Sequence, residues 1–183
     1  MEFFARSALL IGMVSLFGSP VLAQAPVAVR GKSVTATWTE VRVQRLGGMG
    51  DFSERSVAHS LSAYISTEGR VFSRRTSWGG GRRSKAGSVS SVGETTQSGG
   101  GNQSGGFRGR SLIITNKFGG GVRMARIDFD STFTNCTTTV ILGRESGKIA
   151  RGRSLVSGQS LEIKSSTVSN TSCSVKTGNV FGD

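Results

Sequence analysis

The chain has 183 residues, with 23 Lys and Arg against 11 Asp and Glu, and 27 Gly against 2 Pro. This length suits one domain, and the Gly-rich composition disfavours a bundle of helices. The net charge of +12 favours anionic partners. With two Cys and one His, the chain lacks the cysteines and histidines that a tetrahedral zinc site normally uses, so we expect no metal and no cofactor.

The first 23 residues are typical of a secretory signal peptide. Arg6 precedes an apolar run, Ala8–Phe17, which is too short to span a membrane. Val21 and Ala23 then provide the small side chains that signal peptidases recognise. We therefore expect cleavage before Gln24, a periplasmic or secreted protein, and one β domain over residues 24–183 with no transmembrane segment.

The N-terminal half of this domain reads as strands. Residues 32–45 alternate between apolar and polar side chains, but the apolar face changes at Thr39–Glu40, which indicates a β-bulge or a bend. Residues 57–65 alternate in the same way, although a helix starting near Asp51 also fits them. A strand is favoured, because the turn at residues 67–69 continues it as a hairpin.

The rest of the domain contains one long polar segment followed by further strands. Residues 79–106 are rich in Gly and Ser and predict a flexible loop, since they hold few apolar side chains. Strands are expected at residues 111–118, 122–133, 136–142 and 172–178 and around Leu161 and Ile163. Within 122–133 the apolar face changes a second time.

These patterns predict an all-β fold, a single antiparallel β-barrel or β-sandwich of about eight strands, preceded by the cleaved signal peptide. The two changes of apolar face favour the barrel. Cys136 and Cys173 are the only cysteines, and in an oxidising compartment such a pair usually forms a disulfide.

The sequence offers no catalytic motif. His59 stands on an apolar face without a G-x-S-x-G elbow elsewhere, which favours a structural role over that of a base. Asp128 and Asp130 are spaced to point the same way, outwards from Ile127 and Phe129. We therefore expect a protein that is not an enzyme.

Basic residues are densest in residues 70–85, where they flank two aromatic side chains, Phe72 and Trp78. The candidate polyanion-binding residues are Arg70, Arg74, Arg75, Arg82, Arg83 and Lys85. Cations interleaved with aromatics are typical of sites for charged polymers, although arginines also protect sheet edges. An anionic polysaccharide or lipopolysaccharide is the expected partner, and nucleic acid is not.

The resulting hypothesis is an exported, non-enzymatic β domain that binds an anionic cell-envelope or extracellular polymer. Two alternatives stay open, a lipocalin-like carrier of a small ligand and a protein-binding or inhibitor module. Polymer binding predicts strong salt dependence, a carrier predicts a cavity, and an inhibitor predicts a rigid exposed loop.

Overall fold

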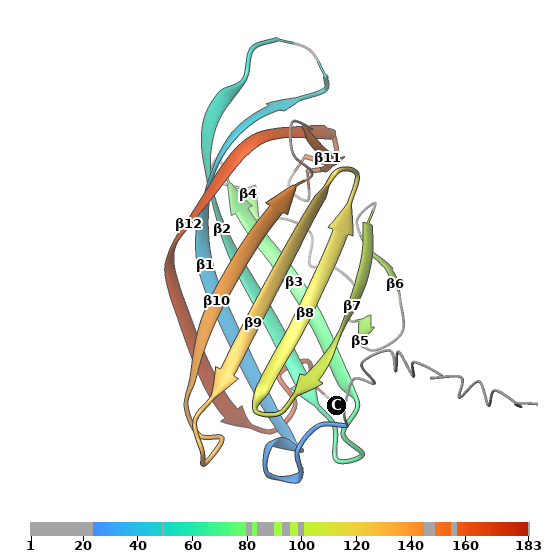
Figure 1. Cartoon of the computed structure of the whole chain (residues 1–183), viewed down its shortest axis with the longest axis vertical. Helices are drawn as coiled ribbons and strands as arrows, with labels where there is room; N and C mark the ends of the chain where they lie inside the picture. Colours follow the sequence, from blue (N-terminus) through green and yellow to red (C-terminus); the bar gives the residue numbers. More distant parts are fainter. Residues whose placement is uncertain are drawn as a thin grey trace, which may run out of the picture.

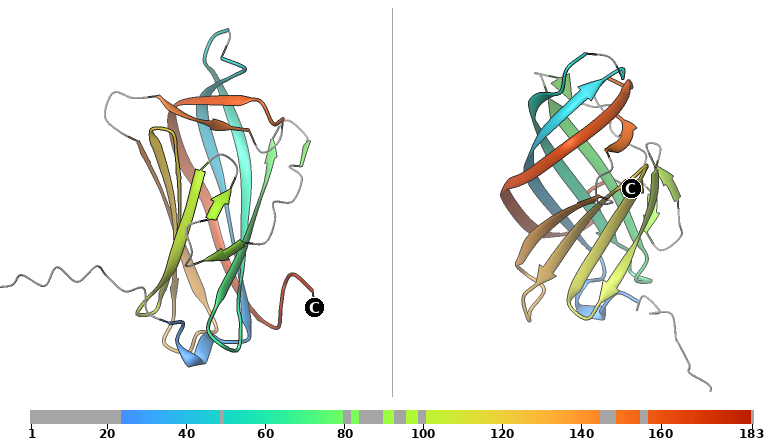
Figure 2. Two further views of the ribbon diagram at one scale, coloured as in Figure 1. Left: turned by 90° about the vertical axis from the view of Figure 1, so that its right-hand side faces the viewer. Right: turned by 45° about the horizontal axis from the view of Figure 1, so that its top comes forward.

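A computed structural model describes residues 24–48, 50–79, 82–83, 90–92, 96–98, 101–144, 149–154 and 157–182. The predicted signal peptide, residues 1–23, lies outside the described residues. The described chain forms two antiparallel sheets that face each other (Figures 1 and 2). The all-β prediction is thus confirmed, but the two sheets are not closed into a barrel, and the preference for that form was wrong.

The first sheet has seven strands, in the order β11-β12-β1-β2-β3-β4 with β5 beside β3, and the second has five, in the order β10-β9-β8-β7-β6. The first sheet's strands are β1 (Lys32–Leu46), β2 (Ser53–Ile65), β3 (Val71–Gly79), β4 (Arg82–Arg83), β5 (Ser90–Val92), β11 (Ala150–Arg153) and β12 (Ser160–Thr177). Those of the second sheet are β6 (Thr96–Ser98), β7 (Gly101–Arg108), β8 (Ser111–Phe118), β9 (Gly121–Phe129) and β10 (Cys136–Arg144). One short 3-10 helix, Val27–Val29, precedes β1.

Strand β1 does not change its inward face, contrary to the prediction at Thr39–Glu40. Its buried side continues past Trp38 through Glu40, Arg42 and Gln44, so three polar side chains occupy inward positions. The irregularities lie in the pairing with β12, where the register shifts twice. The apolar pattern ends there because the inward positions become polar, while the register shift between Thr37 and Thr39 lies beside the predicted bulge.

Strand β9 explains the second predicted change of face in the same way. Its buried positions are Arg123, Ala125, Ile127 and Phe129, which alternate without interruption. Val122 and Met124, whose positions led to the predicted change of face, are half-buried on the opposite side of the strand. Here too a buried arginine interrupts the apolar pattern and the backbone stays regular.

Strand β2 confirms the choice of strand over helix for residues 57–65. Its inward side chains are those of the alternating face that the sequence showed, from Val57 through His59 and Leu61 to Ile65. This strand pairs with β1 throughout, so that His59 lies opposite Trp38.

The main apolar core lies between the lower halves of the sheets in Figure 1. Phe107 and Phe129 stack there, with ring centroids 6.1 Å apart. The predicted disulfide is confirmed: Cys136 on β10 bonds Cys173 on β12, with Cα atoms 5.6 Å apart. It joins the two sheets beside this core.

The segment expected to be a loop, residues 79–106, contains described strands. Its last residues form most of β7, which pairs with β8 from Asn102 to Arg108. Gly105, Gly106 and Phe107 are buried there, because glycine lets the strand approach the core closely while Phe107 fills it. Gly79 ends β3, and the remaining residues of the segment either form β4, β5 and β6 or lie outside the described residues. Within the described part of the chain, no helix is long and apolar enough to cross a membrane.

Candidate functional site

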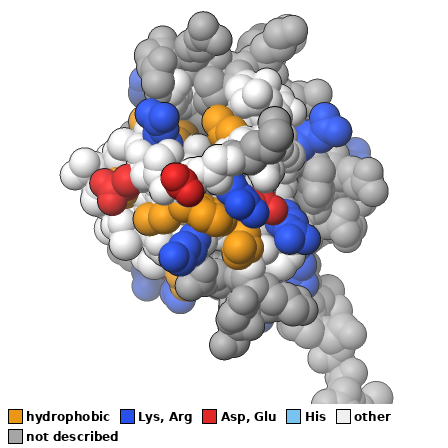
Figure 3. Space-filling view, turned by 90° about the horizontal axis from the view of Figure 1, so that it is seen from above, with side chains coloured by type: hydrophobic (Ala, Val, Ile, Leu, Met, Phe, Trp, Pro, Cys, Tyr) orange, Lys and Arg blue, Asp and Glu red, His pale blue; other side chains and the backbone are white. Residues whose placement is uncertain are grey.

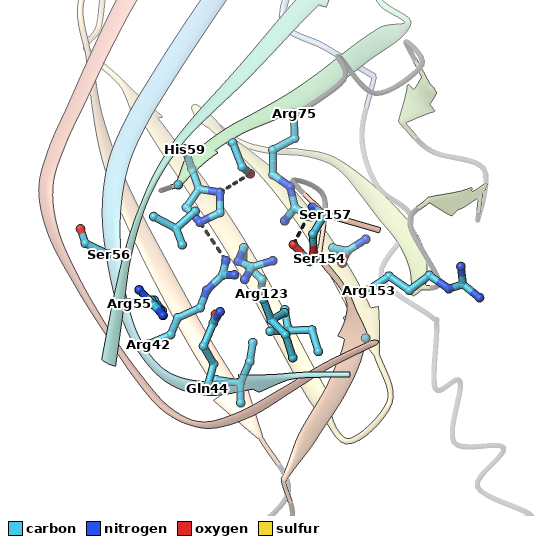
Figure 4. A pocket seen from close by; sticks show the side chains of 18 residues that line it. Arg42, Gln44, Arg55, Ser56, His59, Arg75, Arg123, Arg153, Ser154 and Ser157 are labelled. Carbon is cyan, nitrogen blue, oxygen red and sulfur yellow. Dashed lines mark hydrogen bonds between the residues drawn. The ribbon is translucent and has the colours of Figure 1, made fainter. Parts of the chain in front are cut away.

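A cavity of about 240 Å³ lies between the two sheets, towards the upper end of Figure 1 (Figure 4). Strands β1, β2, β3, β11 and β12 line it from one sheet, and β8 and β9 from the other. Its lining residues include Arg42, Gln44, Leu46, Arg55, Val57, His59, Arg75, Ser77, Asn116, Arg123, Arg153, Leu161 and Ile163. We call this cavity the arginine pocket.

Strand alternation places the arginines of the pocket. Arg42 follows Trp38 and Glu40 at two-residue steps on the inward face of β1, and Arg123 precedes Ala125 on the inward face of β9. Arg75 shares the inward face of β3 with Ser77. Because successive side chains of a strand point to opposite faces, these three cations from three strands meet between the sheets.

Glu40 is the centre of the charged cluster. Its Oε2 accepts hydrogen bonds from Nη2 of Arg42 at 2.7 Å and from Nη2 of Arg123 at 3.0 Å, and His59 Nε2 lies 3.0 Å away. Burial on its own would raise the pKa of Glu40, but His59, Arg123 and Arg42 outweigh burial and hold that pKa far below its usual range. Glu40 is therefore ionised and fully buried.

His59 connects this cluster to a serine. Ser77 Oγ lies 2.8 Å from Nδ1, and the imidazole stacks on Trp38 with ring centroids 5.1 Å apart. With its hydrogen on Nε2, the ring donates to Glu40 and accepts from the Ser77 hydroxyl; with its hydrogen on Nδ1, it donates to Ser77 and accepts from Arg42 Nη2. The chain from Ser77 through His59 to Glu40 has the connectivity of a nucleophile, base and acid.

The electrostatics around His59 oppose a catalytic use of that chain. Burial lowers the pKa of His59 to about 3, and the charges of Arg123 and Arg42 add to this effect against the influence of Glu40. Arg42 Nη2 is only 2.9 Å from Nε2, so an imidazolium would face a guanidinium directly. A neutral His59 that resists protonation is a poor general base, and it serves instead to hold Glu40 and Ser77.

The cluster carries more positive than negative charge. Arg42, Arg75 and Arg123 surround the single carboxylate of Glu40, and none of the residues that line the pocket is Asp or Glu. No carboxylate in the described part of the chain forms an ion pair with Arg75. Burial, Arg123 and Arg42 lower the pKa of Arg75 to about 9, so the side chain still carries its charge at neutral pH.

Several buried polar atoms on β1 have no hydrogen-bond partner within the described protein, among them the donor Arg42 Nε and the acceptors Glu40 Oε1 and Gln44 Oε1. Each buried polar group without a partner destabilises a fold by about 1–3 kcal/mol. A ligand that accepts a hydrogen bond would satisfy Arg42 Nε, whereas the two oxygens need a donor. Arg42 Nε is therefore the unpartnered atom that favours an anionic ligand.

The structure separates two of the arginines that the sequence singled out. Arg74 and Arg75 point to opposite faces of β3: Arg75 lines the pocket, and the guanidinium of Arg74 lies 5.0 Å from the ring centre of Phe181. Arg70 is exposed on the turn before β3. Arg82 and Arg83 form β4, and Lys85 lies outside the described residues.

Sequence reasoning missed Glu40, Arg42, Gln44 and Arg123. The signal that could have found three of them is the two-residue spacing of a strand, because Glu40, Arg42 and Gln44 continue the series of Val34, Ala36 and Trp38. A search for alternating apolar residues misses polar side chains at inward positions.

Among the residues that the structure describes, no group of three or more His, Cys, Asp or Glu is placed to hold a metal ion. No protein-family profile, curated protein or solved structure matches this chain.

Proposed function

We propose that this protein binds a small anion, such as a carboxylate, phosphate or sulfate, in the arginine pocket. The observation that carries the proposal is the convergence of Arg42, Arg75 and Arg123 on one cavity whose described lining contains no carboxylate. Glu40 lies beside this cavity and pairs with Arg42 and Arg123. In this proposal the protein is exported to the periplasm or the medium and acts as a non-enzymatic binding protein.

The chemistry of arginine supports an anion as the ligand. A guanidinium presents planar donors that match the oxygens of carboxylates and phosphates, and such charge-assisted bonds are about twice as strong as neutral ones. The pocket lies between the sheets, where the local dielectric constant is lower than at the surface, so each contact would be stronger than on the surface. Arg75, which has no ion-pair partner in the described chain, is the arginine best placed to receive the anion.

The pocket favours the small-ligand carrier over the polymer-binding hypothesis. A polymer needs cations along an accessible surface, whereas Arg74 and Arg75 are on opposite sides of their strand. The overall charge of +12 still supports steering of any anion towards the protein.

Replacing Arg75 with Met tests the proposal. Calorimetric titration with inorganic phosphate and with sulfate should show binding to the wild-type protein, and Arg75→Met should weaken it at least tenfold. The same variant should unfold at an equal or higher temperature, because it removes a buried charge that Arg42 and Arg123 repel. If Arg75 were only structural, Arg75→Met would lower both the anion affinity and the unfolding temperature.

Arg108→Met is the matched control, because it removes the same charge from an exposed position at the end of β7. It should leave anion binding unchanged. Equal losses in the two variants would indicate diffuse charge attraction, and wild-type protein that binds neither anion at low salt would refute the proposed function.

A further inference from the structure

The arginine pocket changes from polar to apolar along its length. In the pairing of β1 with β12, Gln44 lies opposite Ile163, and Leu46, at the end of its strand, lies opposite Leu161. All four residues line the pocket. The strand end therefore surrounds one end of the cavity with aliphatic side chains.

The cations lie deeper than these aliphatic residues. Arg42 precedes Gln44 and Leu46 on β1, so it lies further from the upper end of that strand. Arg75 lies deeper still on β3, because it pairs with Leu61, two residues beyond His59 along β2. Leu46 is 37% exposed, whereas Leu161 and Ile163 are each 6% exposed, as buried as Arg42 and Arg123 at 7%. By strand position the pocket thus has buried cations at its inner end, and at its outer end three aliphatic side chains beside the exposed Arg55 and Arg153.

The same arrangement is visible from outside. Viewed from above, hydrophobic side chains gather in the middle of this end of the molecule, bordered by Lys or Arg and by Asp or Glu side chains (Figure 3). Leu46 is one of the large hydrophobic residues that stay exposed. An aliphatic rim around a cationic interior has no use for an inorganic anion, which would contact only the inner end.

We propose that the ligand is an amphipathic anion with a single short alkyl chain, its anionic head against Arg75, Arg42 and Arg123 and its chain against Leu46, Leu161 and Ile163. This inference rests on the proposed function and names the class of its ligand. The aliphatic side chains select for the tail by removing it from water, while the arginines fix its orientation with the head inwards.

The size of the cavity limits the tail. A volume of about 240 Å³ equals roughly eight times the share of one molecule in liquid water, and it is smaller than most sites for drug-sized ligands. One short chain fits this volume, and a two-chain membrane lipid does not. We therefore infer a free amphiphile rather than the surface of a membrane.

Three probes of different composition test head and tail separately. Acetate has the head alone, octanoate has head and tail, and 1-octanol has the tail alone. Each buried methylene should tighten binding about fourfold, so octanoate should bind at least tenfold tighter than acetate. Octanoate should also bind at least tenfold tighter than 1-octanol.

A substitution at the rim locates the tail. Leu46→Ser should reduce the octanoate-to-acetate affinity ratio several-fold, and it should fold normally because Leu46 is already 37% exposed. Ile141→Ser is the matched control, because Ile141 is an exposed hydrophobic residue of β10, 47% exposed, that does not line the pocket. It should leave the ratio unchanged.

The outcomes separate this inference from the proposed function. If phosphate and acetate bind but octanoate binds no tighter, the amphipathic ligand is refuted and anion binding stands. If 1-octanol binds as tightly as octanoate, or if none of the anions binds, the proposed function fails and this inference with it. Binding to vesicles of anionic phospholipid without binding to octanoate would also overturn the inference.

Discussion

Glu40→Gln removes the carboxylate that contacts Arg42 and Arg123 while preserving the size of the side chain. Both arginines are 7% exposed and Glu40 is fully buried, so the variant removes a buried carboxylate with which both arginines form ion pairs. Removing one partner of a buried ion pair typically lowers the free energy of unfolding by about 3–5 kcal/mol. Domains of this size are usually stable by about 5–15 kcal/mol, and the variant should still fold.

The same substitution should strengthen anion binding. A negative charge about 5–6 Å from a bound anion repels it by roughly 3 kcal/mol at an effective dielectric constant of about 20. Its removal should therefore tighten phosphate binding at least tenfold, up to about a hundredfold. Glu40→Gln should thus be less stable than wild type in the absence of anions and should gain more stability from added phosphate.

Chemical denaturation with and without phosphate measures both effects. Glu162→Gln is the control, since Glu162 forms its ion pairs with Arg45 and Arg151 outside the pocket, and it should change both quantities far less. If Glu40→Gln fails to fold, the double variant with Arg42→Met should recover stability, because it removes a repelling charge. Unchanged stability with unchanged phosphate affinity in Glu40→Gln would refute the reasoning.

Three further predictions concern the rest of the chain. The free energy of unfolding should fall as the pH decreases from 6.5 towards 4.5, because the unfolded chain takes up a proton at His59 near pH 6.5 while the folded protein, in which the His59 pKa is about 3, does not. This slope reaches at most about 1.4 kcal/mol per pH unit, and His59→Gln should flatten it. An equal slope in the variant would contradict the assignment to His59. Replacing both Cys136 and Cys173 with Ser should lower the free energy of unfolding by roughly 3–4 kcal/mol, as expected for a loop that joins residues 37 apart; calorimetry that finds no loss would show that the bond contributes little. Intact-mass measurement of the exported protein should give Gln24 as its first residue, and retention of residues 1–23 would contradict export by cleavage.

The sequence was informative where the interior of the protein is apolar. It predicted the strands around Trp38 and His59 and the disulfide, because alternating apolar side chains and paired cysteines record burial directly. At Glu40 and Arg123 the same rule produced false changes of face, because it assigns polar side chains to solvent. Both errors mark residues of the buried charged cluster, in which Arg123 pairs with Glu40, and functional sites are where such local rules are most often broken.

That the charged residues of the site lie close together could not be predicted from a single sequence. Glu40 and Arg123 are 83 residues apart and lie on different sheets. No short-range pattern relates two such strands. Only the packing of the sheets brings these charges together, and only then does the excess of arginine over carboxylate become apparent.

The protein keeps its main apolar core and its disulfide at one end and its charged pocket at the other. The side chains of that core, such as Phe107 and Phe129, are thus different from those that line the pocket. Substitutions at pocket positions of β1 and β3 leave that core and the Cys136–Cys173 bond in place. The lining of the pocket can therefore change at the inward positions of these strands, one residue at a time, without rebuilding the scaffold that carries them.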